Sequence, residues 1–177
     1  MQMPTQAELQ ALLDYNPLTG ELTWKPRTPN QISHEAGRNT WNTKYAGKPA
    51  FTSDDGYGYK TGAINYVLMK AHRVIWKMVY GFDPAFIDHE DHDRSNNRLT
   101  NLREATRVQN QQNCKKKSTN KSGTTGVWWN ESKQGWDAFI GLNGRKKNLG
   151  RFRTEQEAIQ ARTDAEILYD YHPNHGQ

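Results

Sequence analysis

The sequence predicts an α+β protein assembled from small units, and three observations predict this class. Hydrophobic residues make up 34% of the 177 residues and the mean hydropathy is −1.03, which argues against one large core. Three threonines are each followed, three residues later, by Glu or Gln, a pattern that starts helices. Two stretches mix aromatic and β-branched residues with Gly and Asn, which is typical of hairpins.

Four helices are predicted along the chain. Three begin after the capping threonines Thr5, Thr106 and Thr154. The fourth lies within residues 70–81, where apolar side chains recur at helical spacing and Gly81 provides a stop.

Strands are predicted in two regions. Residues 56–69 have the composition of a hairpin. Residues 126–152 are expected to form three short strands, with turns near residues 131–135 and at Asn143-Gly144, since Asn-Gly is a strong hairpin signal. The last predicted helix would then pack on this three-stranded antiparallel sheet.

The composition excludes several classes of protein. Cys114 is the single cysteine, so neither an internal disulfide framework nor a multi-cysteine zinc site is possible. No apolar run approaches the roughly 20 residues that span a bilayer, and the first residues lack a signal-peptide pattern. We therefore expect a cytoplasmic protein with no membrane partner.

The charge is distributed unevenly. Residues 114–153 contain ten basic residues and two acids, so this segment alone exceeds the net charge of +5 of the whole chain. Such a block favours a polyanionic partner, with affinity that falls steeply as salt rises. A solvated basic surface is the alternative interpretation.

A dense polar stretch occupies residues 87–113. Residues 86–89 and 99–103 are strand-like, the residues between them are rich in turn formers, and a helix is predicted to begin at Thr106. The segment therefore predicts a β-hairpin followed by a helix.

Three residues of this segment could act together. Adjacent Asp88 and His89 would point to opposite sides of a strand, and Asn110 would lie one turn inside the helix. A carboxylate and an amide oxygen suit a hard cation such as Mg²⁺, and the imidazole could take a proton from a water attacking a phosphodiester. A solvated loop is again the alternative.

The pattern D-H-x-D-x-D-x-S-x-N-R-x-x-N-L-R-x-x-T-x-x-x-N resembles the HNH endonucleases, in the branch encoded by phages and introns, over residues 70–113. The resemblance implies a ββα-metal fold with one divalent ion, Mg²⁺ or Mn²⁺. It implies that Asp88 and Asn110 bind the metal and that His89 is the general base. Asn101 would brace the hairpin and orient His89, and Asn97 is an alternative for the bracing role.

Other metal sites fit the segment poorly. A calcium loop starting at Asp91 would need Gly and Glu where Asn96 and Leu102 stand. A zinc site built on His89 and His92 lacks thiolates, and His92 is left without a predicted role. The arginines of the segment and its flanks either contact phosphates or pair with nearby acids; they are Arg73, Arg98, Arg103 and Arg107.

Residues 122–172 resemble a second family, the ethylene-response-factor-type (AP-two/ERF) DNA-binding domain. The resemblance is carried by Gly126-Val127-x-Trp129, by Asn143-Gly144, by Leu149-Gly150-x-Phe152 and by the helix after Thr154. It implies a three-stranded sheet, packed on one helix, that lays its outer face in the major groove.

Alternation allows only one of Trp128 and Trp129 to face DNA. Thr125 replaces an arginine that often precedes the Gly-Val pair in this family, which removes one expected base contact. The predicted DNA-contacting residues of this half, together with the preceding lysine run, are Lys115, Lys116, Lys117, Trp129, Trp136, Arg145, Lys147 and Arg151.

The sequence thus predicts a metal-dependent DNA endonuclease, a monomer or weak dimer acting on double-stranded DNA. A DNA-binding transcriptional regulator whose nuclease fold is catalytically silent is the alternative. The predicted parts are an N-terminal α/β support region (1–66), a nuclease core (67–116), a basic linker (117–122) and a DNA-binding domain (123–173).

Overall fold

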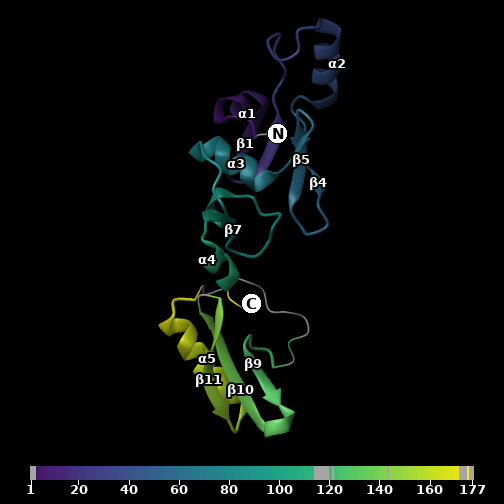
Figure 1. The fold of residues 1–177 in the computed structure, drawn as a ribbon. Coiled ribbons are helices and arrows are strands. Elements are labelled where there is room, and N and C mark those ends of the chain that lie inside the picture. The colour runs from purple at the N-terminus through teal and green to yellow at the C-terminus, as the bar shows by residue number, and fades with distance from the viewer. Residues whose placement is uncertain (1–2, 114–119, 121, 143, 172–174, 176–177) are drawn as a thin grey trace. The chain divides into compact units, whose positions relative to one another are not determined.

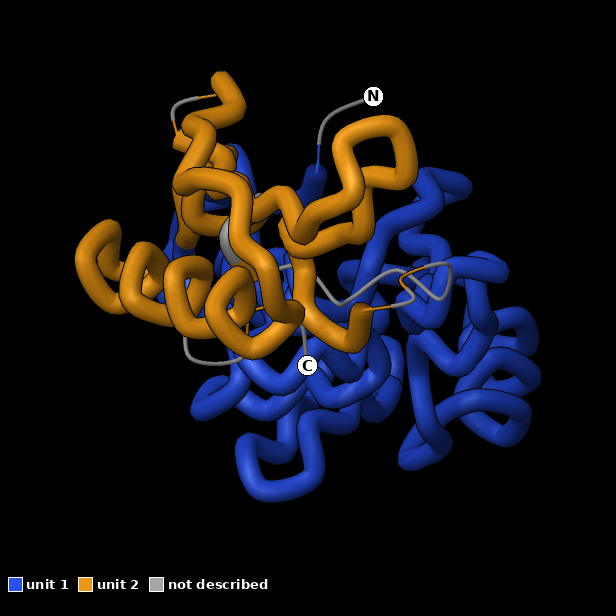
Figure 2. The backbone as a smooth tube through the Cα atoms, turned by 90° about the horizontal axis from the view of Figure 1, so that it is seen from below, with its two compact units in different colours: residues 1–104 blue, residues 105–177 orange. Residues whose placement is uncertain are grey.

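The computed structural model describes residues 3–113, 120, 122–142, 144–171 and 175. It is a mixed α+β structure with small antiparallel sheets (Figure 1). Contacts divide the chain into two compact units, residues 1–104 and 105–177 (Figure 2). This boundary precedes the predicted division after residue 116. Residues 117–119 and 121 of the predicted linker lie outside the described residues.

The first unit begins with a short helix and a small sheet. Thr5 forms the predicted capping box with Glu8. The strands of the sheet pair in the order β1-β2-β3, all antiparallel. The elements of this part are α1 (Gln6–Leu12), β1 (Leu13–Asn16), β2 (Glu21–Trp24), α2 (Glu35–Tyr45) and β3 (Pro49–Ala50).

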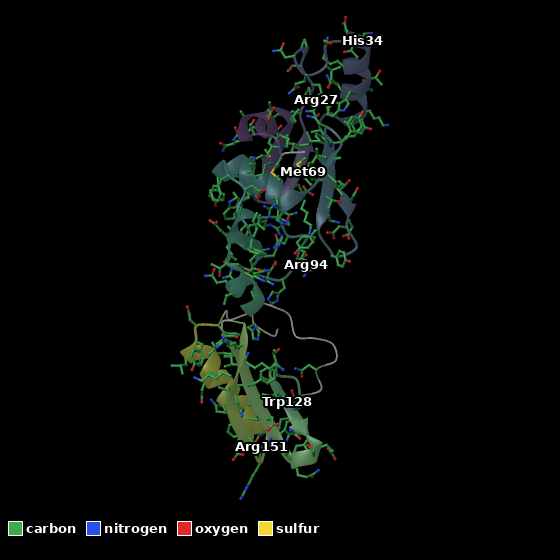
Figure 3. The ribbon with its side chains drawn as sticks, in the orientation of Figure 1. Arg27, His34, Met69, Arg94, Trp128 and Arg151 are labelled. Atoms are coloured by element: carbon green, nitrogen blue, oxygen red, sulfur yellow. The ribbon has the colours of Figure 1, made fainter. Side chains whose placement is uncertain are left out.

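The helix α2 was not predicted. It buries none of its residues, so it has no apolar stripe that a periodicity search could find. It is held partly through Trp41, whose ring meets that of Trp24 edge-on at 5.8 Å. The guanidinium of Arg27, which is labelled in Figure 3, lies 4.1 Å from the Trp41 ring centre.

A second sheet leads into the central helix. It comprises β4 (Ser53–Asp54), β5 (Lys60–Ile64) and β6 (Val67–Lys70). The hairpin predicted in residues 56–69 is confirmed as β5-β6, which turns through Asn65 and Tyr66 at φ 50 and 63.

The predicted fourth helix is confirmed as α3 (Ala71–Tyr80), and Gly81 ends it in the left-handed conformation. Its buried side lies at the centre of the core of the first unit, which includes Leu9, Leu13, Leu22, Met69, Val74, Ile75, Trp76 and Met78.

The polar stretch forms the predicted hairpin with one difference. β7 (Ile87–His89) pairs antiparallel with β8 (Leu102–Glu104). The second strand was expected from residue 99, but Leu99–Asn101 form a 3₁₀ turn. The Asn101 side chain accepts from Asp91 N and donates to Asn96 O, and such local bonds compete with strand pairing.

The second unit contains the predicted three-stranded sheet and its helix. The strands pair antiparallel in the order β11-β10-β9, and Val127, Ala138 and Ala158 form the centre of the core. Thr106 and Thr154 both form capping boxes, as predicted. The elements are α4 (Arg107–Gln112), β9 (Val127–Asn130), a 3₁₀ turn at Glu131–Lys133, β10 (Gly135–Leu142), β11 (Arg145–Phe152) and α5 (Glu155–Leu168).

Asn143 of the predicted Asn-Gly turn lies outside the described residues. Among the described helices, none combines the length and apolar character needed to cross a membrane.

Candidate active site

Asp88 and His89 lie side by side on β7, and both are buried, with 6% and 4% of their surfaces exposed. The hairpin register sets Asp88 opposite Arg103. The guanidinium donates to Asp88 Oδ2 from Nε at 3.0 Å and from Nη2 at 2.8 Å. Arg103, which was predicted to contact phosphate or pair with an acid, therefore holds the carboxylate that was predicted to bind metal.

The imidazole of His89 is enclosed by three side chains. Its Nε2 lies 3.3 Å from Asn97 Oδ1, the ring of His72 meets it edge-on at 5.0 Å, and the ring of Tyr59 lies at 5.8 Å. When the Asn97 oxygen accepts from Nε2, Nδ1 is the basic nitrogen of the ring.

Burial lowers the pKa of His89 below its ordinary value, while the hydrogen bond with Asn97 and nearby aspartates such as Asp91 oppose the shift. The imidazole is therefore neutral at pH 7, the state in which it can accept a proton.

Two asparagines share the two roles predicted for Asn101: one side chain braces the hairpin and the other lies beside His89. The bonds of Asn101 to Asp91 and Asn96 brace the loop, and its carbonyl accepts from Glu90 N at 3.0 Å. The side chain beside the imidazole is that of Asn97, which the sequence offered as an alternative for the bracing role only. The hairpin is therefore braced at one asparagine, and His89 is oriented at another.

The N-terminal sheet fixes the position of Asn97. Tyr15 Oη donates to Asn97 O at 3.0 Å and accepts from Leu99 N at 3.1 Å. A Cβ on Gly20 would come within 2.7 Å of Arg98 N, so this turn can approach only as glycine. Sequence reasoning did not identify Tyr15, because more than 80 residues separate it from its partners.

His72 is a second buried imidazole that sequence reasoning missed. It is 5% exposed, and its Nδ1 has no hydrogen-bond partner among the described residues. Burial, followed by the neighbouring His89, lowers its pKa to about 3. The signal available in the sequence was a histidine within the apolar run of the predicted helix.

We expect His72 to destabilise the protein at acidic pH. Its folded pKa of about 3 lies below the ordinary 6.5, so the unfolded chain binds the extra proton and stability falls as pH drops below about 6.5. Each pH unit in that window removes up to about 1.4 kcal/mol. Denaturant unfolding at pH 7 and pH 5 measures the loss, and His72→Phe is expected to lessen it; an equal loss in the variant would assign the acid sensitivity to other groups.

The predicted phosphate-contacting arginines of the first unit make internal contacts. Arg73 pairs with Asp83 at 2.5 Å and donates to Pro84 O. Arg98 donates to Leu18 O at 2.6 Å and to the Asn96 side chain. These arginines support the hairpin and its surroundings, and their predicted contacts with DNA remain predictions.

The other predicted residues of this segment belong to the second unit or fall outside the described residues. Asn110 and Arg107 lie on α4, in the second unit, so the convergence of Asn110 with Asp88 at one ion stays a prediction. Lys115, Lys116 and Lys117 lie outside the described residues.

The donor chemistry at Asp88 fits a hard cation. A carboxylate is the type of ligand that Mg²⁺ takes, one or two at a time while it keeps several waters, and in this structure Arg103 contacts Oδ2 of Asp88. Among the described residues, no three or more His, Cys, Asp or Glu side chains gather as a metal site. The predicted ligand set contains only one such residue, Asp88, together with the amide of Asn110.

The register of the β9-β10-β11 sheet divides the predicted DNA-contacting residues between its two faces, and their contacts with DNA remain predictions. Trp129 pairs with Trp136, their rings meet at 5.6 Å, and Trp136 packs on the core shared with α5. Lys147 bonds to Tyr169, which follows α5. Since Arg145 lies at an even spacing from Lys147, these four residues share the side of the sheet that faces the helix.

The opposite face of the sheet carries a different set. Trp128 meets Phe139 edge-on at 4.8 Å, and Lys146 Nζ lies 4.5 Å from the Phe139 ring centre. Arg151 is on this face, as predicted, but it forms a two-point ion pair with Asp137. The face opposite the helix is therefore aromatic. Of the predicted cations, Arg151 is neutralised by Asp137, and Arg145 and Lys147 lie on the other face.

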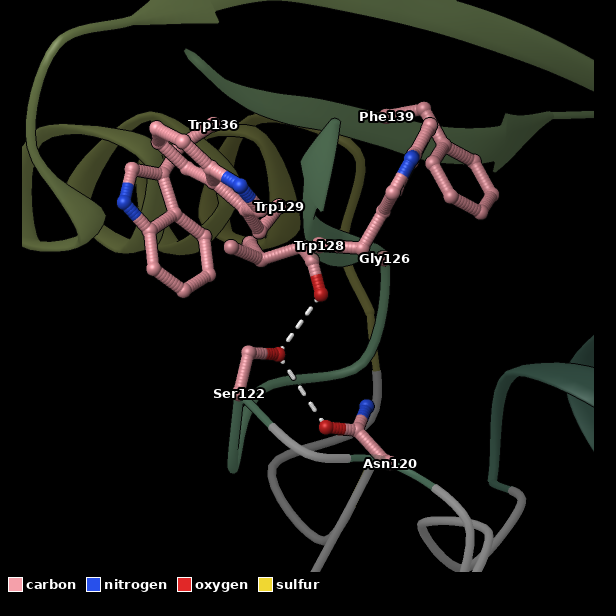
Figure 4. A pocket seen from close by; sticks show the side chains of 8 residues that line it. Asn120, Ser122, Gly126, Trp128, Trp129, Trp136 and Phe139 are labelled. Atoms are coloured by element: carbon pink, nitrogen blue, oxygen red, sulfur yellow. Dashed lines mark hydrogen bonds between the residues drawn. The ribbon is translucent and has the colours of Figure 1, made fainter. Parts of the chain in front are cut away.

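A cavity of about 510 Å³ lies along β9 in the second unit (Figure 4). Trp128, Trp129, Trp136 and Phe139 contribute its rings, and Ser122, which also lines it, donates from Oγ to Val127 O at 2.6 Å. The described lining residues carry no ionisable side chain, so the cavity offers ring surfaces, and acid–base chemistry falls to the β7 hairpin.

Comparison with known proteins identifies the class. Residues 69–112 match the family model of the HNH endonucleases. The chain is 35% identical over 95 residues to "Uncharacterized HNH endonuclease L560" of Acanthamoeba polyphaga mimivirus, a match spanning 52% of this chain and 48% of the viral protein. No solved structure matches the chain. Residues 69–112 are therefore an HNH endonuclease-family domain, which places the chain among nuclease-type hydrolases.

A second relative, from a phage, is matched over a larger share of its own length. The chain is 31% identical over 86 residues to "Protein 3.8" of Escherichia phage T7, covering 48% of this chain and 71% of the phage protein. The chain belongs to the same family as this phage protein, and it carries the HNH endonuclease domain within it.

Proposed function

We propose that the protein is a metal-dependent endonuclease that hydrolyses phosphodiester bonds of double-stranded DNA. The observation that carries the proposal is the buried imidazole of His89 beside the buried carboxylate of Asp88, inside the HNH endonuclease domain. HNH endonucleases are generally dependent on a divalent metal ion.

Each residue of the site would have a distinct task. His89 would take the proton of the attacking water, and Asn97 would hold the ring through Nε2. Asp88 and Asn110 would hold one Mg²⁺ or Mn²⁺, which supplies charge stabilisation at the leaving oxygen. Tyr15 would keep Asn97 in place from the N-terminal sheet.

Supercoiled plasmid provides the first test. Nicked or linear product is expected with Mg²⁺ or Mn²⁺ and none with EDTA. DNA binding without cleavage, under both metals and over several plasmid sequences, would instead support the catalytically silent regulator.

We propose that the enzyme acts in the cytoplasm of a bacterial host or phage-infected cell, as a monomer or weak dimer.

We further propose that residues 123–173 form an AP-two/ERF-like domain that selects the DNA site. The three-stranded sheet packed on α5 and the basic block of residues 114–153 support this part. In this proposal the face of the sheet that carries Trp128, opposite the helix, contacts the DNA.

Removal of residues 117–177 is expected to lower DNA affinity sharply while leaving weak, unspecific nicking. Much of the basic block is lost, and with it the counterion release that drives binding. Fluorescence anisotropy with a duplex at several salt concentrations measures the affinity, and plasmid nicking measures the activity. Equal affinity of the truncated and full-length chains would refute a targeting role for the C-terminal domain.

A further inference from the structure

Two cations of the first unit lie against one tyrosine ring. Lys70 Nζ is 3.5 Å from the ring centre of Tyr59, and the guanidinium carbon of Arg94 is 4.9 Å from it. The three residues come from separate segments: Lys70 ends β6, Tyr59 precedes β5 and Arg94 lies in the loop after β7. Tertiary structure therefore brings together two positive charges that the sequence keeps apart.

The arrangement is built by further contacts. Arg94 donates to Tyr57 O at 3.0 Å, and Lys70 pairs with Asp55 at 3.4 Å. The Asp55 carboxylate accepts from the backbone N–H groups of Tyr57 and Tyr59, and these bonds help to lower its pKa, so it stays charged. The turn that carries Tyr59 is thus fixed by the same carboxylate that positions Lys70.

The ring that holds these cations also touches the candidate catalytic group. Tyr59 lies 5.8 Å from His89 and 5.1 Å from His72, centre to centre. Tyr59 therefore connects the proton acceptor on one side with Lys70 and Arg94 on the other. Arg94 is exposed and the Lys70 side chain is 40% exposed, so both can reach a ligand in solvent.

We infer that Lys70 and Arg94, held by Tyr59, form a subsite for a phosphate of the DNA strand next to the scissile phosphate, the one attacked by the water that His89 deprotonates. Asp55 balances one of the two cations, and the remaining positive charge suits a phosphodiester, which carries one negative charge. Arg73 and Arg103 each pair with an aspartate, whereas Arg94 contacts a backbone carbonyl and the Tyr59 ring. The inference rests on the proposed endonuclease function, because it assigns a position along the substrate.

Salt-dependent DNA binding tests the subsite separately from cleavage. With a mixed-sequence duplex as the probe, Arg94→Ala and Lys70→Met are each expected to reduce the slope of log affinity against log salt by about 0.9. Lys60→Met is the matched control, since Lys60 lies on the adjacent strand, its side chain is also 40% exposed and it also pairs with an aspartate. The control is expected to keep the wild-type slope.

The tyrosine provides a second arm. Tyr59→Phe keeps the ring and is expected to keep the slope, whereas Tyr59→Leu removes the ring face that aligns the cations and is expected to reduce the slope. Thermal unfolding checks that each variant is folded. On plasmid, Arg94→Ala is expected to raise KM several-fold with little change in kcat.

The outcomes separate the two proposals. Wild-type slopes in folded Arg94→Ala and Lys70→Met would overturn the subsite, whether or not the protein cuts DNA. Reduced slopes with no cleavage by the wild-type protein would keep the phosphate subsite as a binding site and reject the endonuclease function. If Lys60→Met lowered the slope by the same amount, the effect would be one of general surface charge, and this result would also overturn the subsite.

Discussion

Replacing His89 by alanine is expected to lower the rate of plasmid cleavage by about 100- to 10,000-fold, the usual contribution of general acid–base catalysis. The imidazole is 4% exposed, and burial keeps it neutral. It therefore contributes almost no charge to phosphate binding, and the affinity for DNA is expected to stay near the wild-type value. Single-turnover cleavage and fluorescence anisotropy measure the two quantities.

His92, in the loop that follows β7, provides the control. His92 has φ 64, a conformation that asparagine tolerates, so His92→Asn is expected to fold and to cut DNA normally. An undiminished cleavage rate in His89→Ala would remove His89 from the chemistry. A comparable loss in His92→Asn would show that the loop, and not one proton acceptor, limits the rate.

The pH dependence of cleavage should follow the same group. The folded pKa of His89 lies below its ordinary value, so the imidazole becomes neutral at a lower pH than a free histidine. The rate is expected to rise with pH on the acidic side and to level off before neutral pH. A rate that still rises steeply through pH 7 would indicate a different proton acceptor.

Local sequence signals predicted most of the helix starts and hairpins. Each capping threonine formed its box, because that pattern involves residues only three apart. The helix α2 escaped prediction because it buries no residue. The sequence could not decide which face of the β9-β10-β11 sheet meets DNA, because aromatic residues lie on both sides, Trp128 with Phe139 on one and Trp129 with Trp136 on the other. Alternation therefore gives no unique apolar face.

The adjacency of Asp88 and His89 followed from the sequence, but their surroundings did not. Asn97 is placed by Tyr15, from a strand more than 80 residues earlier. Tyr59 directly precedes β5 of the β4-β5-β6 sheet, and its ring contacts His89 as well as Lys70 and Arg94. Contacts over such separations depend on how sheets and helices pack, and no local pattern encodes them. The sequence therefore predicted the reacting groups better than the groups that position them.

Asp88→Asn is expected to lower cleavage nearly as much as the loss of His89 while preserving the fold of the hairpin. The amide keeps the size of the carboxylate and can still accept from Arg103, but it loses the charge that a divalent ion requires. Affinity for DNA is expected to be equal or slightly higher, since the variant gains one unit of positive charge and the guanidinium is no longer neutralised.

The Asp88 variant is measured by cleavage over a titration of Mg²⁺ and Mn²⁺, with Asp54→Asn as the control. Asp54 is an exposed aspartate on β4, and its replacement is expected to leave the metal dependence unchanged. Partial recovery of cleavage at high metal concentration would be consistent with a weakened site. Full cleavage at the wild-type metal concentration would mean that Asp88 serves only to hold Arg103 in the hairpin, and that any metal ion is bound elsewhere in the chain.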